Sequence, residues 1–534
     1  MKSKLLSLLL LGAYSIATAQ NIDPLWVRHE IADGGTLYGS PFVMVDSFHN
    51  TFVCSQDNSP GQGNSFLTTK YDADGNLLWK REYDSFGNDL LTAMAVDSAG
   101  SVYVGGNTIQ NLVSGTLPRF IVIKYAPNGD TLWNYRFDGP TVGVNYLTKL
   151  LLDSAQNLMV FGLYGDTVAL RGALFVAKVS PDGQELWRAT YLDSIYGFEG
   201  TDARWIGDRW IFWGRNTAAT GYRYIAWQVD NNGQSMGTAI TEFDPALFNT
   251  QYIDQQGNLF VGGHNRYKVT KYNLLGEKVW AYDRPLMPSS ASIPAGLSCI
   301  ESNTASEVFL SGFVRVDSIG LKPLTTKLNA VGNLQWEHSP LFNDIKEGGS
   351  NRSYWLNEDQ LLVAGVSLIK LNGNYLREYS LAVYDENGFV QGGISDLEGE
   401  LNAPTSIAVD GTFLYVAGYA EDELVSNPSR QILCKYALSD LVSTKTAPQA
   451  LGHLNLYPNP ATNWLHIQIP ETVENKGLRR LELVDMAGKI LCSQAVAAQA
   501  TFADLSLLGL PGGVYVVIFK QNGLPTHSEQ VVKP

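Results

Sequence analysis

The feature that most limits the fold of this chain is an internal repeat of about 52 residues. It is clearest in three segments: LTTKYDADGNLLWKREYD (67–84), IVIKYAPNGDTLWNYRFD (121–138) and FVAKVSPDGQELWRATYLD (175–193). Each segment has an alternating strand pattern, a glycine, and a tryptophan four residues after that glycine. Weaker copies follow at 224–237, 268–283, 323–336 and 380–392. Such units must stack on their neighbours, because one unit alone cannot bury its apolar face.

A second segment in each repeat predicts a β-hairpin. AMAVDSAGSVYVGGN (93–107) is typical, with an apolar strand, a tight Asp/Gly turn and an alternating strand that ends in glycine. Each repeat then holds four short strands, and we predict no helix of any length between them. Four strands in about 50 residues are the signature of a β-propeller blade.

Eight repeat anchors set the expected number of blades. They are Trp26, Trp79, Trp133, Trp187, Gly237, Trp280, Trp336 and Gly392. Trp26 has no matching strand before it, but residues 432–436 near the end supply one. We therefore expect the last strand to complete the first blade and close the ring, which leaves no unpaired edge. The prediction is an all-β, eight-bladed propeller at 22–441. Seven blades is the alternative, because two anchors are glycines in weak repeats.

The N-terminus predicts a secretory signal peptide at residues 1–19. Lys2 and Lys4 precede an apolar stretch at 5–16 that is too short to span a bilayer. Ala17 and Ala19 form an A-x-A cleavage site, so the mature chain should begin at Gln20. We expect no transmembrane segment, because no later stretch reaches 18 apolar residues.

After a polar linker at 442–450, the tail at 451–534 predicts a small Ig-like β-sandwich. Its segments LYPNPATNWLHI (456–467), VDMAGKIL (484–491) and DLSLLGLPGGVYVVIF (504–519) resemble the type A C-terminal sorting domain of the type IX secretion system. The matching residues are Tyr457, Pro458, Asn459, Pro460, Asp485, Gly488, Lys489, Gly513 and Tyr515. The resemblance departs at Pro511-Gly512-Gly513, where a single glycine is usual.

The resemblance implies a bacterium of the Bacteroidota and a tail that the type IX secretion machinery reads. It also implies a protein that is secreted or displayed on the outer cell surface, with the tail often removed on export. The body resembles bacterial propellers of the SBBP or quinoprotein-like kind. That second resemblance is at the level of the repeats and names no substrate.

Composition and motifs exclude several functions. The net charge of −14 argues against nucleic-acid binding, which needs a basic surface. We predict no cofactor, metal site or catalytic group, since HExxH, P-loop and G-x-S-x-G motifs are absent. Asp72-x-Asp74-Gly75 reads as a plain turn, because the later acidic residues of a calcium loop are missing. The four cysteines are too far apart for a disulfide framework, so buried thiols are expected.

We expect a non-catalytic, exported binding protein for an extracellular protein or glycan. Candidate binding segments are the non-repeating loops at 283–297, 338–352 and 393–405. The aromatic–acid pairs Tyr83-Asp84, Phe137-Asp138, Phe243-Asp244 and Tyr282-Asp283 could bind sugars, although their fixed offset from the anchor favours a structural role. The alternative function is an extracellular glycan lyase or hydrolase that uses carboxylates at the mouth of the propeller channel.

Overall fold

The computed structural model describes residues 24–30, 36–59, 63–109, 119–137, 143–166, 171–193, 198–218, 221–242, 248–263, 266–284, 295–316, 320–338, 345–371, 374–388, 390–395, 403–421, 429–442, 452–469, 479–485, 490–497, 500–521 and 524–534. These residues divide into two compact units, one ending at Val442 and the other within 443–534. Both units are built almost entirely of antiparallel strands.

The first unit, within its described residues, consists of eight four-stranded antiparallel sheets. The first sheet contains β2 (Thr36–Val45), β3 (Thr51–Ser59), β4 (Gly63–Tyr71) and β5 (Leu77–Tyr83), and the second contains β6 (Asn88–Val96), β7 (Val102–Ile109), β8 (Arg119–Tyr125) and β9 (Thr131–Phe137). The third sheet contains β10 (Gly143–Leu152), β11 (Leu158–Asp166), β12 (Arg171–Val179) and β13 (Glu185–Asp193), and the fourth contains β14 (Phe198–Ile206), β15 (Arg209–Ala218), β16 (Gly221–Asp230) and β17 (Ser235–Ile240).

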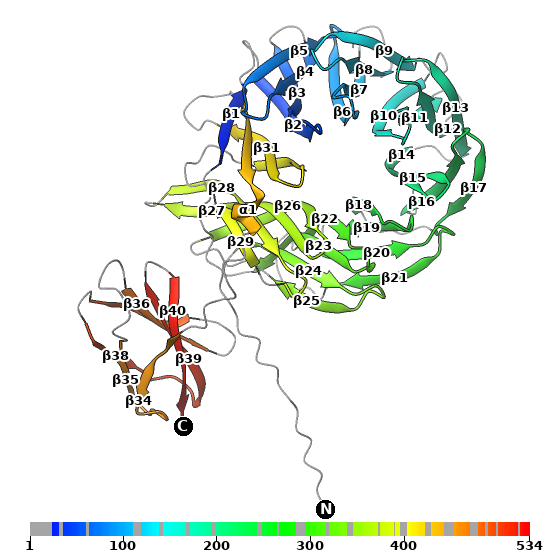
Figure 1. The fold of residues 1–534 in the computed structure, drawn as a ribbon. Coiled ribbons are helices and arrows are strands. Elements are labelled where there is room, and N and C mark those ends of the chain that lie inside the picture. The colour runs from blue at the N-terminus through cyan, green and yellow to red at the C-terminus, as the bar shows by residue number, and fades with distance from the viewer. Residues whose placement is uncertain are drawn as a thin grey trace, which may run out of the picture. The chain divides into compact units, whose positions relative to one another are not determined.

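The next three sheets are β18 (Phe248–Ile253), β19 (Leu259–Gly263), β20 (Lys268–Tyr272), β21 (Lys278–Asp283); β22 (Ala295–Ser302), β23 (Val308–Val316), β24 (Gly320–Leu328), β25 (Leu334–His338); and β26 (Ile345–Asn357), β27 (Gln360–Leu371), β28 (Asn374–Tyr384), β29 (Val390–Ser395). The sheets follow one another around a ring, with the first strand of each nearest the centre (Figure 1). The four strands per repeat predicted from the sequence are confirmed, and both weak repeats form complete sheets.

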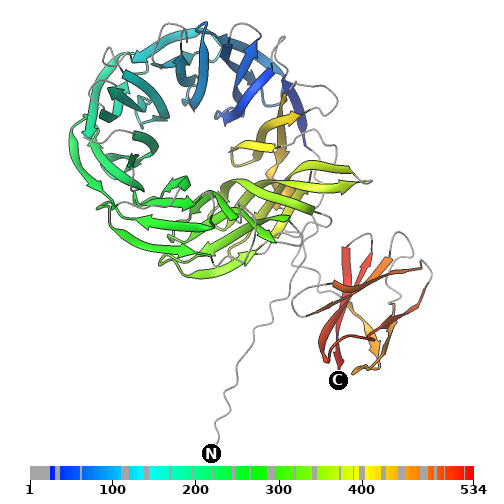
Figure 2. The ribbon, with the colours of Figure 1, turned by 180° about the vertical axis from the view of Figure 1, so that it is seen from behind.

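The eighth sheet joins the two ends of this unit. Its order is β1 (Trp26–Glu30), β32 (Ser429–Ala437), β31 (Phe413–Glu421) and β30 (Ala403–Val409). In the register of β1 and β32, Trp26 lies opposite Lys435 and His29 opposite Ile432. Figure 2 shows blue β1 beside the yellow-orange strands of the chain's later part. The pairing of the last strand of the propeller with the first is as predicted. The expectation of no helix is wrong at one place, because residues after β32 form the short helix α1 (Leu438–Val442).

Apolar side chains fill the spaces between neighbouring sheets. Phe120 and Tyr103, for example, share one buried cluster with Phe175 and Val160 of the next sheet. The closing sheet is joined in the same way, since Tyr415 and the residues around it pack against the sheet of β2–β5. Each sheet therefore buries both faces, which explains why the repeat carries so many large apolar residues.

The repeated acid, lysine and tryptophan form one contact between sheets, here called the acid–lysine–tryptophan unit. In the sheet of β6–β9, Asp97 caps its hairpin turn with Oδ1 and lies 3.2 Å from Lys124 Nζ through Oδ2. Lys124 Nζ and Trp133 Nε1 both donate hydrogen bonds to the Pro181 carbonyl in the next sheet, at 3.1 and 2.9 Å. The unit therefore fastens each sheet to a turn of the next.

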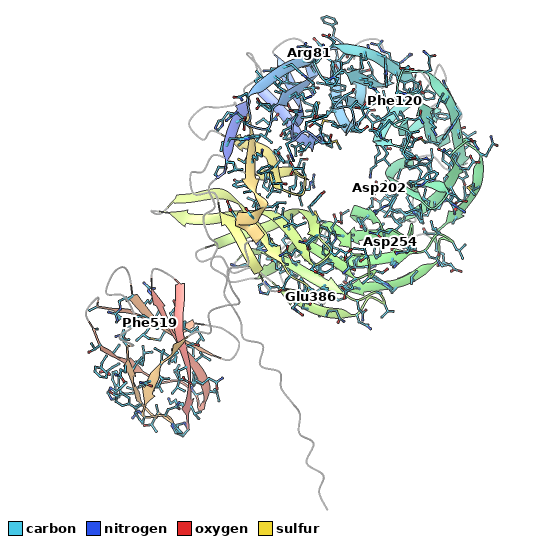
Figure 3. The ribbon with its side chains drawn as sticks, in the orientation of Figure 1. Arg81, Phe120, Asp202, Asp254, Glu386 and Phe519 are labelled. Atoms are coloured by element: carbon cyan, nitrogen blue, oxygen red, sulfur yellow. The ribbon has the colours of Figure 1, made fainter. Side chains whose placement is uncertain are left out.

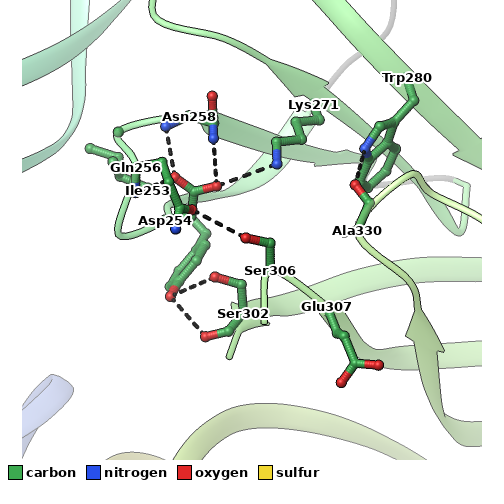
Figure 4. Close-up of polar contacts among 12 residues, drawn as sticks. Ile253, Asp254, Gln256, Asn258, Lys271, Trp280, Ser302, Ser306, Glu307 and Ala330 are labelled. Carbon is green, nitrogen blue, oxygen red and sulfur yellow. Dashed lines mark hydrogen bonds and ion pairs between the residues drawn. The ribbon is translucent and has the colours of Figure 1, made fainter. Parts of the chain in front are cut away.

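Six sheets contain this unit. Its members are Asp46, Lys70 and Trp79; Asp97, Lys124 and Trp133; Asp153, Lys178 and Trp187; Asp254, Lys271 and Trp280; Glu307, Lys327 and Trp336; and Asp410, Lys435 and Trp26. Figure 4 shows the fourth example, in which Asp254 contacts Lys271 while Trp280 donates to the Ala330 carbonyl of the next sheet. In the closing sheet, Trp26 comes from the first strand of the ring, β1, and Lys435 from its last strand, β32. Both side chains donate to the Ala73 carbonyl.

The two weak repeats lose all three members together. Gln228 and Gly237 stand opposite each other where the other sheets have lysine and tryptophan, and Val383 and Gly392 do so in the second case. In the first of these sheets Trp213 Nε1 donates instead to the Gly257 carbonyl of the next sheet, at 3.2 Å. The joint loss fits a structural role, because a buried carboxylate without its lysine would be costly.

The second unit contains two sheets around one apolar core. The five-stranded sheet has the order β33 (Gly452–His453), β40 (Leu524–Lys533), β39 (Gly513–Gln521), β36 (Arg479–Asp485) and β37 (Ile490–Val496). The three-stranded sheet has the order β34 (Asn455–Tyr457), β35 (Trp464–Gln468) and β38 (Phe502–Ser506). The described residues of this unit thus form eight strands, of which β33 pairs over only two residues.

Candidate functional site

The innermost strands of the ring share one local distortion. Each first strand shifts its register against the second by a β-bulge or a similar irregularity. The shifts lie between Tyr38 and Phe42, Leu91 and Ala93, Leu147 and Lys149, Gly200 and Asp202, Phe248 and Thr250, Leu297 and Cys299, Ser350 and Arg352, and Pro404 and Ser406. A bulge re-aims the side chains beside it, so this position can present different residues on a common frame.

On part of the ring, charged side chains occupy the residue that follows this shift or the residue two positions further along the strand. Together with the uncharged Tyr354 on β26, they form the inner-strand cluster: Lys149 on β10, Asp202 and Arg204 on β14, Glu301 on β22, and Arg352 on β26. Figure 3 shows Asp202 toward the inside of the ring and Arg81 toward its outside. At the same positions β2 and β6 carry Phe42, Met44, Ala93 and Ala95. The inner strands β10, β14, β22 and β26 thus carry charges at positions where β2 and β6 carry apolar residues.

Ion pairs and hydrogen bonds connect the cluster to neighbouring sheets. Lys149 Nζ forms an ion pair with Asp202 of the next sheet, and the two side chains are 37% and 22% exposed. Arg204 donates to the Ile253 carbonyl at 2.6 Å, and Arg352 donates to the Thr405 carbonyl at 2.7 Å. Arg352 is exposed, so part of its guanidinium remains accessible to a ligand.

Glu301 has the most perturbed carboxyl group in the cluster. Burial raises its pKa to about 8, and Asp202 adds to the rise while Arg204 opposes it. At neutral pH Glu301 is therefore mostly protonated and can donate a hydrogen bond, whereas Asp202 beside Lys149 accepts one. A protonated carboxyl group close to a second carboxyl group and an arginine is a common arrangement in acid–base sites.

The remaining neighbours show that the cluster is electrostatically connected. Burial raises the pKa of Tyr354, and the charge of Glu301 contributes to that rise. Burial also raises the pKa of Cys299 to about 11; Arg352 lowers it, and Glu301 adds to the rise. Groups from the sheets of β14, β22 and β26 therefore act on one another although they lie about 50 to 150 residues apart in the chain.

The aromatic–acid pairs are structural where the structure describes them. Tyr83 packs on Phe66 with ring centroids 5.7 Å apart, and Phe137 packs on Phe175 at 4.2 Å. Tyr282 is partly buried against the cluster around Phe260. Asp138, Phe243 and Asp244 lie outside the described residues.

Much of the predicted binding loops also lies outside the described residues, namely 285–294, 339–344 and 396–402. Residues 345–352 of the second loop are not loop, because β26 begins at Ile345. This strand carries Arg352 of the inner-strand cluster.

The other predicted residues have ordinary surroundings. Asp72 Oδ1 accepts the backbone N–H groups of Asp74 and Asn76, which is a turn-capping contact. All four cysteines are thiols, and burial raises the pKa of Cys54 to about 12. Within the described part of the chain, no three His, Cys, Asp or Glu side chains could together hold a metal ion.

Sequence reasoning missed the inner-strand cluster, although a signal was present. The first strands of the predicted hairpins align as FVMV (42–45), AMAV (93–96), KLLL (149–152) and CIES (299–302). The copies on β2 and β6 are apolar throughout, and the charges of Lys149 and Glu301 depart from them. Departures from a structural repeat on a rigid scaffold are the positions where function can reside.

In the tail, one motif residue ties a turn to the last strand. Asn459 Nδ2 donates to the Gln530 carbonyl at 2.7 Å, and its Oδ1 accepts the Val532 N–H at 2.9 Å. The peptide bonds preceding Pro458 and Pro460 are cis, and the Tyr457 side chain is 49% exposed.

The other motif residues lie on the five-stranded sheet or outside the described residues. Tyr515 on β39 lies opposite Asp485 on β36 and donates to the Pro511 carbonyl at 2.6 Å. Gly513 begins β39. Gly488 and Lys489 fall in a segment that the structure does not describe.

Residues 455–533 match the family described as the secretion system C-terminal sorting domain. The tail is a type IX sorting domain. Proteins that carry a sorting domain of this family are secreted or displayed on the cell surface, and this protein is therefore one of them. None of the helices in the described residues is both long and apolar enough to cross a bilayer.

Solved structures with similar folds are distant. The extracellular domain of a candidate one-component system from Bacteroides thetaiotaomicron has 9% identity and a TM-score of 0.19, and the match covers 95% of this chain and 98% of that one. A candidate 6-phosphogluconolactonase from Bacteroides fragilis has 9% identity and a TM-score of 0.35, with 68% and 98% covered. Regucalcin, a calcium-binding protein from Agrobacterium tumefaciens, has 12% identity and a TM-score of 0.28, with 61% and 99% covered.

At TM-scores this low, the similarities carry neither a blade number nor an activity over to this chain. No curated protein sequence matches the chain significantly. The sorting domain and the inner-strand cluster are therefore the features from which a function can be argued.

Proposed function

We propose that this protein is an exported, eight-bladed β-propeller that binds an extracellular protein or glycan at the inner-strand cluster. The proposed organisation is a signal peptide at 1–19, the propeller at 22–441, a linker at 442–450 and an Ig-like sorting domain at 451–534. The sorting domain would be read by the type IX machinery through the motif that includes Asn459 and Tyr515.

The observation that carries the binding proposal is that Lys149, Asp202, Arg204, Glu301 and Arg352 stand at positions where β2 and β6 carry apolar residues. The apolar residues at the same positions of β2 and β6 show that an inner strand of the ring forms without such charges. Eight four-stranded sheets, with Trp26 and Lys435 meeting in the closing sheet, support a closed ring. A closed ring holds residues of several sheets in fixed positions around its centre.

A second function, an extracellular glycan lyase or hydrolase, is favoured by a separate observation. Glu301 carries a raised pKa beside the charges of Asp202 and Arg204, and these residues come from different sheets. A protonated carboxyl and an ionised one can act as general acid and base on a glycosidic bond.

The test is a glycan and polysaccharide array run with the chain lacking residues 1–19, scored for both retention and cleavage. Retention without cleavage that is lost in Arg352→Ala supports the binding protein. Cleavage that is lost in Glu301→Gln supports the enzyme instead. Lys278→Ala, on the exposed face of outer strand β21, is the matched control. Retention that no inner-strand substitution alters would contradict both functions.

A further inference from the structure

The charge of the inner-strand cluster is opposite to that of the whole chain. The chain has a net charge of −14, yet the cluster holds three cations, Lys149, Arg204 and Arg352, against two acids. Burial keeps Glu301 mostly protonated at neutral pH, so Glu301 adds little negative charge to the cluster. This local excess of positive charge is complementary to an anionic group on a ligand.

Exposed aromatic side chains stand on the same strands as the cations. Tyr146 on β10 and Tyr354 on β26 are each 38% exposed, and Trp205 on β14 is 41% exposed. An exposed aromatic ring beside hydrogen-bonding groups suits a sugar, whose C–H face packs on the ring while its hydroxyl groups bind polar side chains. Tyr354 follows Arg352 by two residues along one strand, so ring and guanidinium point to the same side of that strand.

We infer that the ligand of the inner-strand cluster is an acidic carbohydrate, bound through its carboxylate or sulfate groups by Arg352 and Lys149 and through its sugar rings by Tyr354. This inference rests on the proposed binding function and narrows it. Arginine suits the anionic group because its planar guanidinium can bind two oxygens at once.

Other anionic macromolecules fit the surface less well. Nucleic acids need an extended basic surface, whereas the cations here are confined to the inner strands β10, β14 and β26. An acidic peptide would use the cations but would give the exposed tyrosines no sugar-like face to pack on. The exported location also places the cluster where extracellular polysaccharides occur.

The experiment measures binding of the chain lacking residues 1–19 to polygalacturonate, chondroitin sulfate, neutral dextran and polyglutamate by affinity electrophoresis. We expect retardation by at least one acidic polysaccharide and none by dextran or polyglutamate. Arg352→Ala and Lys149→Ala should each weaken it at least tenfold, and raising the salt concentration should weaken it further. Tyr354→Ala should weaken binding by a similar factor while Tyr354→Phe retains it. Lys278→Ala should bind like the unaltered protein.

Different results would contradict the acidic-carbohydrate ligand and the proposed binding function. Equal binding of polyglutamate, dextran binding that depends on Arg352, or no acidic polysaccharide bound would overturn the acidic-carbohydrate ligand and leave the binding function standing. Binding of acidic polysaccharide that neither Arg352→Ala nor Tyr354→Ala alters would overturn the inner-strand site itself. Arg352 and Tyr354 are exposed, so these variants should fold, and their unfolding temperatures verify it.

Discussion

Asp97 shows how one residue of the repeat both caps a turn and forms an ion pair. Its Oδ1 caps the turn at Ala99 and Ser101, and its Oδ2 faces Lys124, while only 6% of its side chain is exposed. Such a pair contributes little compared with apolar residues of similar size, but removing one partner leaves a buried charge. Local turn geometry and packing between sheets are therefore coupled at this residue.

Lys124→Met should destabilise the protein by about 3–5 kcal/mol, because it leaves Asp97 buried without its cation. The double variant Asp97→Asn with Lys124→Met should recover part of that loss, as the sheets with Gln228 and Val383 do without the unit. Urea unfolding of the three variants and the unaltered protein measures the coupling. A double variant less stable than Lys124→Met would contradict the unit as described.

Glu301 makes stability depend on pH. Its pKa in the folded protein is about 8 against an ordinary 4.5, so the folded state holds the proton more tightly than the unfolded state. The free energy of unfolding should therefore fall as pH rises from 4.5 to 8, by up to about 1.4 kcal/mol per pH unit from this group, and then level off.

Glu301→Gln removes that loss, so its unfolding temperature should exceed that of the unaltered protein at pH 8 and approach it at pH 5. Thermal unfolding followed by circular dichroism from pH 5 to 9 measures the difference. Glu358→Gln, at an exposed turn, should run parallel to the unaltered protein throughout. A constant difference between Glu301→Gln and the unaltered protein would show that its carboxyl is not buried as described.

At the scale of the elements, the outer turns determine how closely the sheets approach. Gly183, in the turn between β12 and β13, has φ of +86°, and a Cβ there would lie 2.7 Å from Trp133 Cγ of the preceding sheet. Gly411, in the turn between β30 and β31, has the same φ but no atom within 4 Å of a Cβ. The repeat therefore needs glycine at the outer turn for two reasons, backbone conformation and space for the tryptophan.

The two glycines form a matched pair for mutation. Gly411→Ala should cost about 1 kcal/mol from the backbone alone. Gly183→Ala should cost a further 1–3 kcal/mol, roughly, because the methyl group must displace Trp133. Urea unfolding midpoints of both variants measure the difference, and equal destabilisation would mean that the tryptophan contact is not tight.

At the scale of the whole molecule, the sheets of the first unit form a ring in which the first and last strands pair. The second unit carries the export signal. Deleting 451–534 should leave the propeller folded, because the closing sheet is complete at Ala437 and the tail has its own core. The truncated protein should accumulate in the periplasm, since the predicted signal peptide crosses only the inner membrane.

Cell fractionation with a propeller-specific antibody measures the location, and circular dichroism of the purified truncation checks the fold. A truncated protein that still reached the cell surface would show that another segment carries the export signal. Mass spectrometry of the unaltered exported protein should find Gln20 at its N-terminus.

The sequence by itself determined the repeat, the four strands of each unit, the strand that closes the first sheet and the sorting domain. These follow from local information: alternation along a strand, glycine at turns that need positive φ such as Gly75 and Gly183, and short motifs such as Tyr457–Pro460. Only the tertiary structure decided which charges meet. Lys149, Asp202, Glu301 and Arg352 lie in four different repeats, and although Glu301 departs from the apolar copies of the repeat, the sequence does not show which of these charges lie close together. The raised pKa of Glu301 depends on burial and on charges from other sheets, and these exist only once the ring has formed.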